Sequence, residues 1–198
     1  RDFYTIGYLF EHKFDQDLVV RQNLRYAEAD VKQGDSIYGI GLSINPATGL
    51  PSNYRSLNRY QWDVDRRQRY FTVDNQMEAR FETGPLKHDL LLGLDYRRSL
   101  LDQTVYGGLS SPIDIFTPVY GNYSVLGTKA ADSSERQSQL GLYAQDQIRF
   151  ERFLLTLGLR QDWVSGNNFN RLTRRDTKID DAALTGRVGL TYLFDSGF

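Results

Sequence analysis

The sequence has no cysteine, and only five prolines and two histidines among its 198 residues. Without cysteine the chain cannot be a disulfide-stapled scaffold, and so few prolines argue against a low-complexity linker. Its formal net charge of −1 lacks the strong positive balance of a nucleic-acid-binding protein, so we expect no nucleic-acid partner. The composition therefore indicates a folded domain and says little else about its partners.

A long hydrophobic run is also missing. The longest uncharged stretch, residues 36–54, is rich in Gly, Ser, Asn and Pro, so we expect no transmembrane helix. A mean hydropathy of −0.52 does not exclude a membrane barrel, because a barrel strand shows lipid only alternate residues. No signal peptide precedes Arg1, and the chain begins without methionine inside a strand pattern. We therefore expect an internal piece of a longer protein.

The stretch from Ser138 to Trp163 has the pattern of a β-hairpin that turns at Glu151–Arg152. In its second half, polar and small residues alternate with the apolar positions Phe153, Leu155, Leu157, Leu159 and Trp163. Aromatic residues at both ends with leucines between them are typical of a lipid-facing strand with a girdle at each interface. At ~3.3 Å per residue and a ~40° tilt, this stripe is roughly 25 Å high, the height of an outer-membrane apolar band.

The same alternation recurs along the chain and predicts an all-β fold with about seven antiparallel strands and no substantial helix. We expect the strands near residues 4–14, 18–31, 59–81, 88–100, 137–149, 153–165 and 182–194.

The connections between these strands alternate in length. Short turns are expected at 15–17, 82–85, 151–152 and, after the last strand, 195–197, whereas long loops are expected at 31–58, 100–135 and 165–181. Short turns on one side of a membrane and long loops on the other are typical of an up-and-down transmembrane β-barrel. An odd, unclosed set of strands leaves two unpaired edges, which favours a segment of a larger barrel.

Several segments resemble a known family. GLYAQDQIRFERFLLTLGLRQDWV, FTVDNQMEARFETGPLKHDLLLGLDYRRS, IDIFTPVYG and TGRVGLTYLFDSG are similar to the middle of the barrel of TonB-dependent siderophore receptors, especially the ferrichrome and hydroxamate type. The similarity extends over nearly the whole chain. The resemblance therefore implies that residues 1–198 are one partial β-barrel domain of such a receptor.

The resemblance also implies a function. In that family a barrel of about 22 strands encloses an amino-terminal plug, and a TonB-type energy-coupling protein of the inner membrane drives import of the ferric siderophore. The expected location is the outer membrane of a Gram-negative bacterium, with membrane lipid around the barrel and a hydroxamate siderophore as transported ligand. We expect the plug, the coupling box and the carboxy-terminal strands to lie outside this chain. A passive porin-like or adhesin barrel is the alternative, because the alternation alone fits both.

Neither enzymatic chemistry nor a metal cofactor is indicated by the remaining residues. His12 and His88 lack a second ligand at metal spacing and are expected to be solvated histidines at strand ends. Two acidic groups lack the glycine and spacing of a calcium loop and are expected to be solvated charges: Asp63, Asp65 and Asp74, and Asp176, Asp180 and Asp181. No serine near either histidine lies in a hydrolase motif, so we expect no catalytic residues.

Charged residues on the polar faces are expected to pair inside the barrel, Asp95 with Arg97 and Arg160 with Asp162. Aromatic residues beside the turns and loops are expected to be membrane girdles: Phe81, Phe153 and Phe194 on one side, and Tyr26, Tyr96 and Trp163 on the other.

Tyr38 and Tyr106 differ from these girdle residues. Each lies beyond a strand on the loop side, within glycine-containing sequence (IYGIG and VYGG), where no girdle is needed. Because the resembling family lines its outer pocket with aromatic residues at similar places, these two tyrosines are the candidate siderophore-binding residues. A plain loop-packing role is the alternative for both.

Overall fold

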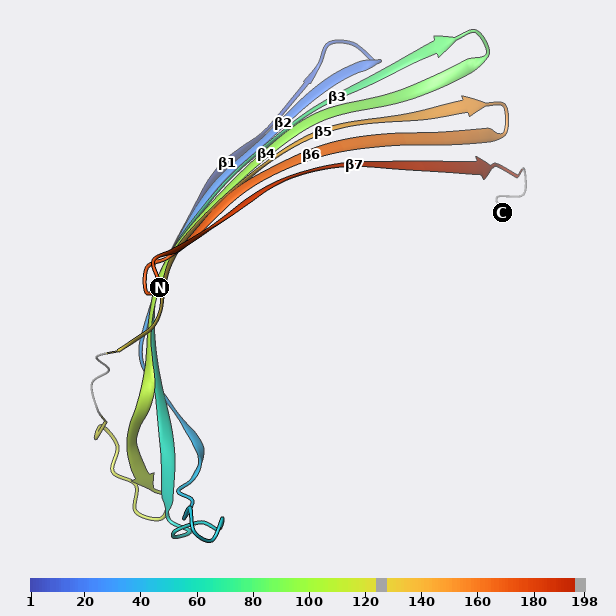
Figure 1. Cartoon of the computed structure of the whole chain (residues 1–198). Coiled ribbons are helices and arrows are strands. Elements are labelled where there is room, and N and C mark those ends of the chain that lie inside the picture. Colours follow the sequence, from blue (N-terminus) through green and yellow to red (C-terminus); the bar gives the residue numbers. More distant parts are fainter. Residues whose placement is uncertain (124–127, 195–198) are drawn as a thin grey trace.

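The computed structural model describes residues 1–123 and 128–194, and in this part of the chain it contains strands but no helix. The seven strands are β1 (Asp2–Lys13), β2 (Leu18–Leu42), β3 (Ser56–Thr83), β4 (Leu86–Asp114), β5 (Lys129–Phe150), β6 (Phe153–Asn170) and β7 (Arg175–Tyr192). They form one sheet in the order β1-β2-β3-β4-β5-β6-β7, and every neighbouring pair is antiparallel. Figure 1 shows this sheet as a single bent layer. The predicted all-β, up-and-down architecture is confirmed.

The short turns lie where the sequence predicts them. Residues 14–17, 84–85 and 151–152 connect their strands at one end of the sheet. Gly84 and Glu151 adopt left-handed backbone conformations, with φ values of 59° and 50°. The fourth expected turn, at 195–197, lies outside the described residues.

The strands are longer than predicted on the loop side. β3 has 28 residues and β4 has 29, so residues 43–55 connect β2 to β3, and β4 ends only at Asp114, before β5 begins at Lys129. The prediction of a loop over 165–181 is wrong, because β6 and β7 continue pairing up to Asn170 and Arg175 around a four-residue turn. Beyond the membrane both faces of a strand meet polar surroundings, so apolar alternation ends while backbone hydrogen bonding continues.

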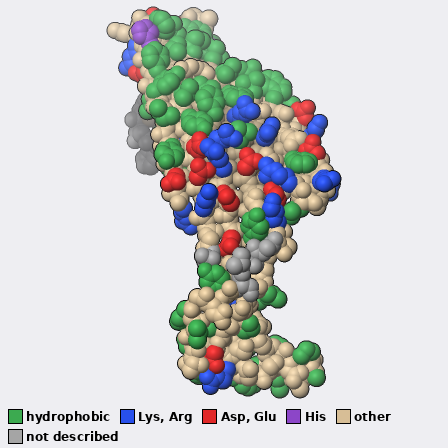
Figure 2. Space-filling view, turned by 90° about the vertical axis from the view of Figure 1, so that its left-hand side faces the viewer, with side chains coloured by type: hydrophobic (Ala, Val, Ile, Leu, Met, Phe, Trp, Pro, Cys, Tyr) green, Lys and Arg blue, Asp and Glu red, His purple; other side chains and the backbone are tan. Residues whose placement is uncertain are grey.

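The register assigns side chains to the two faces, since directly opposite residues point to the same side of a sheet. Leu157, Val188 and Leu190 share the outward face with Leu155. Figure 2 looks onto the side that is on the left in Figure 1, and apolar side chains cover its upper part. A belt of charged side chains lies below this apolar band, on the parts of the strands that extend toward the loops.

Girdle residues follow the predicted arrangement on this outward face. Tyr96, Leu140 and Trp163 form one cross-strand row on the loop side. On the turn side, the Phe153 ring lies 5.0 Å from the Tyr192 ring, which lies 4.7 Å from the Phe194 ring. These aromatic rows bound the apolar band at its two margins, as expected for residues that set the depth of a barrel in lipid.

Candidate ligand-binding site

An aromatic cluster lies on the inner face of the sheet, on the loop side of the membrane. The Tyr38 ring of β2 lies 5.8 Å from the Tyr60 ring of β3, and Tyr60 lies 6.2 Å from the Trp62 ring. Tyr38 and Trp62 remain partly exposed, at 53% and 36%. Tyrosine and tryptophan combine a large apolar face with a polar group, so this cluster presents an amphipathic surface.

Backbone irregularity places Tyr38 on this face. The β2–β3 register shifts between Gln33 and Ser36, and the shift reverses the face on which the following β2 residues lie. Tyr38 consequently pairs with Tyr60. Sequence alternation alone could not have located this bulge.

Gly107 of β4 provides the room for the cluster. A Cβ atom at this position would lie 2.7 Å from the Tyr60 hydroxyl and 3.0 Å from the Trp62 ring. Tyr60 and Trp62 are members of the cluster that the sequence reasoning missed, although their i, i+2 spacing is a signal that would place both on one face.

Tyr106 is not brought together with Tyr38. It pairs with Asp63 of β3 and with Lys129 of β5, in the register row next to that of Trp62 and Gly107, and so it points to the outward face. The structure therefore places the two candidate tyrosines on opposite faces of the sheet.

Charged side chains hold the loop ends at this end of the sheet. The guanidinium of Arg59, 8% exposed, donates hydrogen bonds of 2.6 Å to the backbone carbonyls of Ser111 and Asn122. Arg55 forms an ion pair with Asp114 at 2.8 Å and lies over the Phe116 ring at 5.3 Å. The Arg55 hydrogen bond, followed by amides of Thr117 and Phe116, lowers the pKa of Asp114 to about 2.

Arg171 ties the β6–β7 turn to the neighbouring strands. Its guanidinium forms ion pairs with Asp102 at 2.6 Å and with Asp132 at 3.0 Å. The pKa of Asp132 is lowered, first by its hydrogen bond from Lys129 and then by Arg171. This cluster joins β4, β5 and the turn after β6 outside the membrane.

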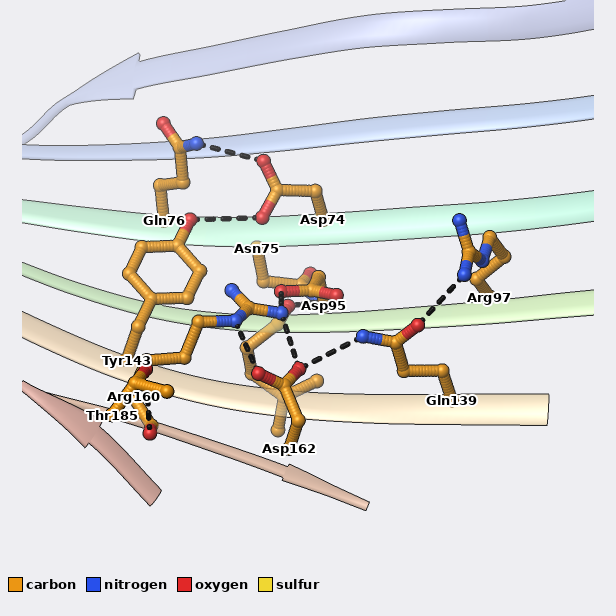
Figure 3. A network of polar contacts seen from close by, with 11 residues as sticks. Asp74, Asn75, Gln76, Asp95, Arg97, Gln139, Tyr143, Arg160, Asp162 and Thr185 are labelled. Atoms are coloured by element: carbon orange, nitrogen blue, oxygen red, sulfur yellow. Dashed lines mark hydrogen bonds and ion pairs between the residues drawn. The ribbon is translucent and has the colours of Figure 1, made fainter. Parts of the chain in front are cut away.

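A second polar network lies on the inner face at membrane level, as Figure 3 shows. The guanidinium of Arg160 lies 2.8 Å from Asp95 and 2.7 Å from Asp162. The expected pairing of Arg160 with Asp162 is confirmed, but that of Asp95 with Arg97 is wrong, because Arg97 donates to Gln139 instead. Gly141 lies between Asp95 and Asp162 in the register and has no side chain to block Arg160.

The histidines lie on the outward face. His12 contacts the Phe14 ring at 4.5 Å and is exposed. The expectation that His88 is solvated is wrong, since its side chain is 12% exposed, stacks on Phe81 and bonds Asp146 at 2.7 Å. Cross-strand packing, which sequence spacing does not reveal, covers this ring. Within residues 1–123 and 128–194, no three His, Cys, Asp or Glu side chains gather as a metal site.

Comparisons with known proteins agree with this geometry. Residues 1–198 match the family described as TonB dependent receptor-like, beta-barrel. The chain is 33% identical over 210 residues to the ferrichrome outer membrane transporter/phage receptor of Escherichia coli, covering 97% of this chain and 28% of that protein. It is 34% identical over 192 residues to the ferrioxamine B receptor of Salmonella typhimurium, covering 97% of this chain and 26% of that protein. It thus spans about a quarter of the length of these relatives.

Solved structures show the same fold at lower identity. The ferric citrate transporter FecA in its unliganded form superposes with a TM-score of 0.67 at 14% identity, covering 98% of this chain and 25% of that chain. The siderophore receptor PiuA from Acinetobacter baumannii superposes with a TM-score of 0.68 at 19% identity, covering 96% of this chain and 29% of that chain. In the described part of this chain, no helix is long and apolar enough to cross a membrane. The chain belongs to the TonB-dependent receptor β-barrels, which are transport receptors of the Gram-negative outer membrane and not enzymes.

Proposed function

We propose that the complete protein imports ferric siderophores of the hydroxamate type across the outer membrane, with energy supplied through a TonB-type coupling protein. In this proposal the coupling box and a lumen-filling plug belong to parts of the protein outside residues 1–198, and outer-membrane lipid surrounds the barrel. The iron complex is cargo, and no resident cofactor is needed. Relatives named for ferrichrome and ferrioxamine B, both hydroxamates, support the ligand class.

The observation that carries the proposal is the aromatic cluster of Tyr38, Tyr60 and Trp62. It lies on the inner face, on the loop side of the membrane-spanning band, where a ligand would enter a barrel. A ferric hydroxamate encloses its iron in an organic shell, so a receptor recognises it through aromatic contact and a few hydrogen bonds rather than by ligating the metal. Two phenols and an indole supply both kinds of contact.

Tyr38 and Tyr106 are both proposed as siderophore-binding residues, and their positions give them different roles. Tyr38 contributes its ring directly to the cluster, whereas Tyr106 lies behind the same wall and would act through the position of β4. The Tyr106→Ala variant should therefore have the smaller effect on affinity.

Titration of ferrichrome and ferrioxamine B into the purified full-length receptor tests this proposal. Truncating an aromatic residue that a bound ligand buries commonly costs on the order of 2 kcal/mol, or roughly thirtyfold in affinity, so Tyr38→Ala, Tyr60→Ala and Trp62→Ala should each weaken binding. Tyr96→Ala is the matched control, because Tyr96 lies in the outward girdle and should change stability only. Unchanged affinity in all three cluster variants would contradict the site, and absence of binding by the parent would favour a passive barrel.

A further inference from the structure

Within the part of the chain that the structure describes, two arginines on the inner face at membrane level have no acidic partner. Arg25 of β2 and Arg97 of β4 both face Thr72 of β3 in the register, so they lie on the same side of the sheet. Two strand spacings separate them, which corresponds to roughly 10 Å between their Cα atoms. Both residues are exposed in the part of the chain that the structure describes.

The nearby carboxylates are already engaged. Asp95 and Asp162 share Arg160, and Asp74 accepts hydrogen bonds from Tyr143 at 3.0 Å and from Gln76 at 2.7 Å. Figure 3 shows these carboxylates turned toward Arg160 and Tyr143, while Arg97 reaches only the amide oxygen of Gln139. Among the described residues, the Arg25 side chain forms no hydrogen bond or ion pair.

Space for a partner lies in front of these arginines. A cavity of about 730 Å³ is lined by Arg25, Thr72 and Arg97, and it also includes Gly7 and Leu9 of β1. Gly7 lies directly opposite Arg25 in the register and carries no side chain. Leu9 is 86% exposed and lies on the same face, so the cavity offers an apolar contact beside Arg25 and Arg97, with Asp74, Asp95 and Arg160 also in its lining.

We propose that this cavity receives an acidic segment of the plug, with an aspartate or glutamate lying between Arg25 and Arg97. This inference rests on the proposed function, which places a plug inside the barrel. Packing a plug against this wall would remove both guanidiniums from water, and such burial is costly unless an opposite charge compensates it. An arginine fork binds a carboxylate in bidentate geometry, so two arginines flanking Thr72 favour a carboxylate over a neutral side chain.

Carbodiimide cross-linking of the purified full-length receptor tests the assignment. In Arg97→Lys and Arg25→Lys variants, a carboxylate that lies against the new amine is activated by the carbodiimide. The lysine then attacks it, an amide forms, and the reagent leaves as its urea. Mass spectrometry should find position 97 or 25 joined to an aspartate or glutamate outside residues 1–198. The parent, whose arginines do not react, should give no such peptide.

Two matched variants calibrate the experiment. Arg21→Lys should cross-link within the chain, because Arg21 lies between Glu11 and Glu78. Arg97→Gln keeps the Gln139 neighbour but supplies no amine and should give no product. The assignment would be overturned if the two lysine variants cross-linked only to Asp74, Asp95 or Asp162. It would also be overturned if they gave no product at all. Siderophore binding by the same preparation is read separately, so that failure of the plug contact and failure of the proposed function remain distinguishable.

Discussion

The imidazole Nδ1 of His88 lies 2.7 Å from a carboxylate oxygen of Asp146, on the face of the sheet that carries the apolar band. The Nε2 atom of the same ring lies 2.6 Å from the Thr83 hydroxyl, and the ring stacks on Phe81 at 4.7 Å. The pair thus joins β4 to β5 near the short-turn end of the sheet. A polar pair in such surroundings is tolerated only while each group supplies the other's hydrogen bond.

His88→Phe should destabilise the barrel by about 2 kcal/mol, because it keeps the ring stacking but leaves Asp146 without its partner. The double variant His88→Phe/Asp146→Leu should recover most of that loss, since no unpaired carboxylate remains. Urea unfolding of the receptor in lipid vesicles measures both free energies. A double variant as unstable as the single one would show that the carboxylate is not the source of the cost.

Leu159→Arg should cost ~2 to 4 kcal/mol of unfolding free energy, because Leu159 is 61% exposed on the lipid face near the middle of the band. Leu157→Arg should cost less, because Leu157 lies opposite Asp146, which could pair with the new guanidinium. Thr156→Arg, which points to the inner face, should cost least. The same vesicle assay ranks the three, and equal costs would contradict the assignment of faces.

Gly107→Ala should weaken siderophore affinity with little loss of stability. The added Cβ would meet the Tyr60 hydroxyl and the Trp62 ring, so both rings must shift. We expect a loss of on the order of 1 kcal/mol, or roughly fivefold in affinity, in ligand titration. Gly189→Ala is the control, because it lies far from the cluster and the nearest atom to a Cβ there would be 4.0 Å away.

Gly141→Val should disrupt the Arg160 network. Its side chain would occupy the space in which Arg160 meets Asp95, and forced repacking of this kind typically costs about 1 to 3 kcal/mol. Gly166→Ala, where the nearest atom to the Cβ would be 3.4 Å away, provides the comparison. Thermal unfolding of the two variants measures the difference, and equal midpoints would mean that Arg160 relocates freely.

Acid should release the loop that Asp114 holds. The pKa of Asp114 in the folded protein is lowered to about 2 from an ordinary value of 3.8, so its contribution to stability is present above pH 4 and is lost as pH falls toward 2. The Phe116 and Thr117 amides, which donate to Asp114, should lose protection against hydrogen exchange, relative to the intrinsic rate at each pH, over that interval. Arg55→Gln removes the largest cause of the shift and should move the release to higher pH.

The sequence predicted the parts of the fold that lipid imposes. Alternation from Phe153 to Trp163 and the short turns at Gly84 and Glu151 were sufficient to assign strands, faces and turn positions there. Beyond the membrane the same strands continue without apolar alternation, so the pattern over 165–181 predicts a loop although this stretch forms paired strands around a turn.

The candidate site was predicted only in part, and for the same reason. Tyr38 depends on a bulge after Gln33 that no periodicity reveals, and Tyr106 shares its glycine-containing sequence context but not its face. The apolar alternation does not indicate Tyr60 and Trp62, because they lie in the part of β3 that precedes it. The Arg160 network could not be predicted either. It forms because Gly141 of β5, which lies between Asp95 of β4 and Asp162 of β6, has no side chain to occupy the space of the guanidinium.

The length of β3 has a mechanical consequence. Tyr60, which pairs with Tyr38, lies eleven residue steps along β3 from Phe71 at the girdle level, a rise of roughly 35 Å along the strand. The aromatic cluster of Tyr38, Tyr60 and Trp62 therefore lies on paired, hydrogen-bonded strands and not on a flexible loop. A ligand bound at this cluster must still move along the sheet to reach the level of the bilayer. Binding at the cluster and passage through the membrane therefore occur at different places in the barrel.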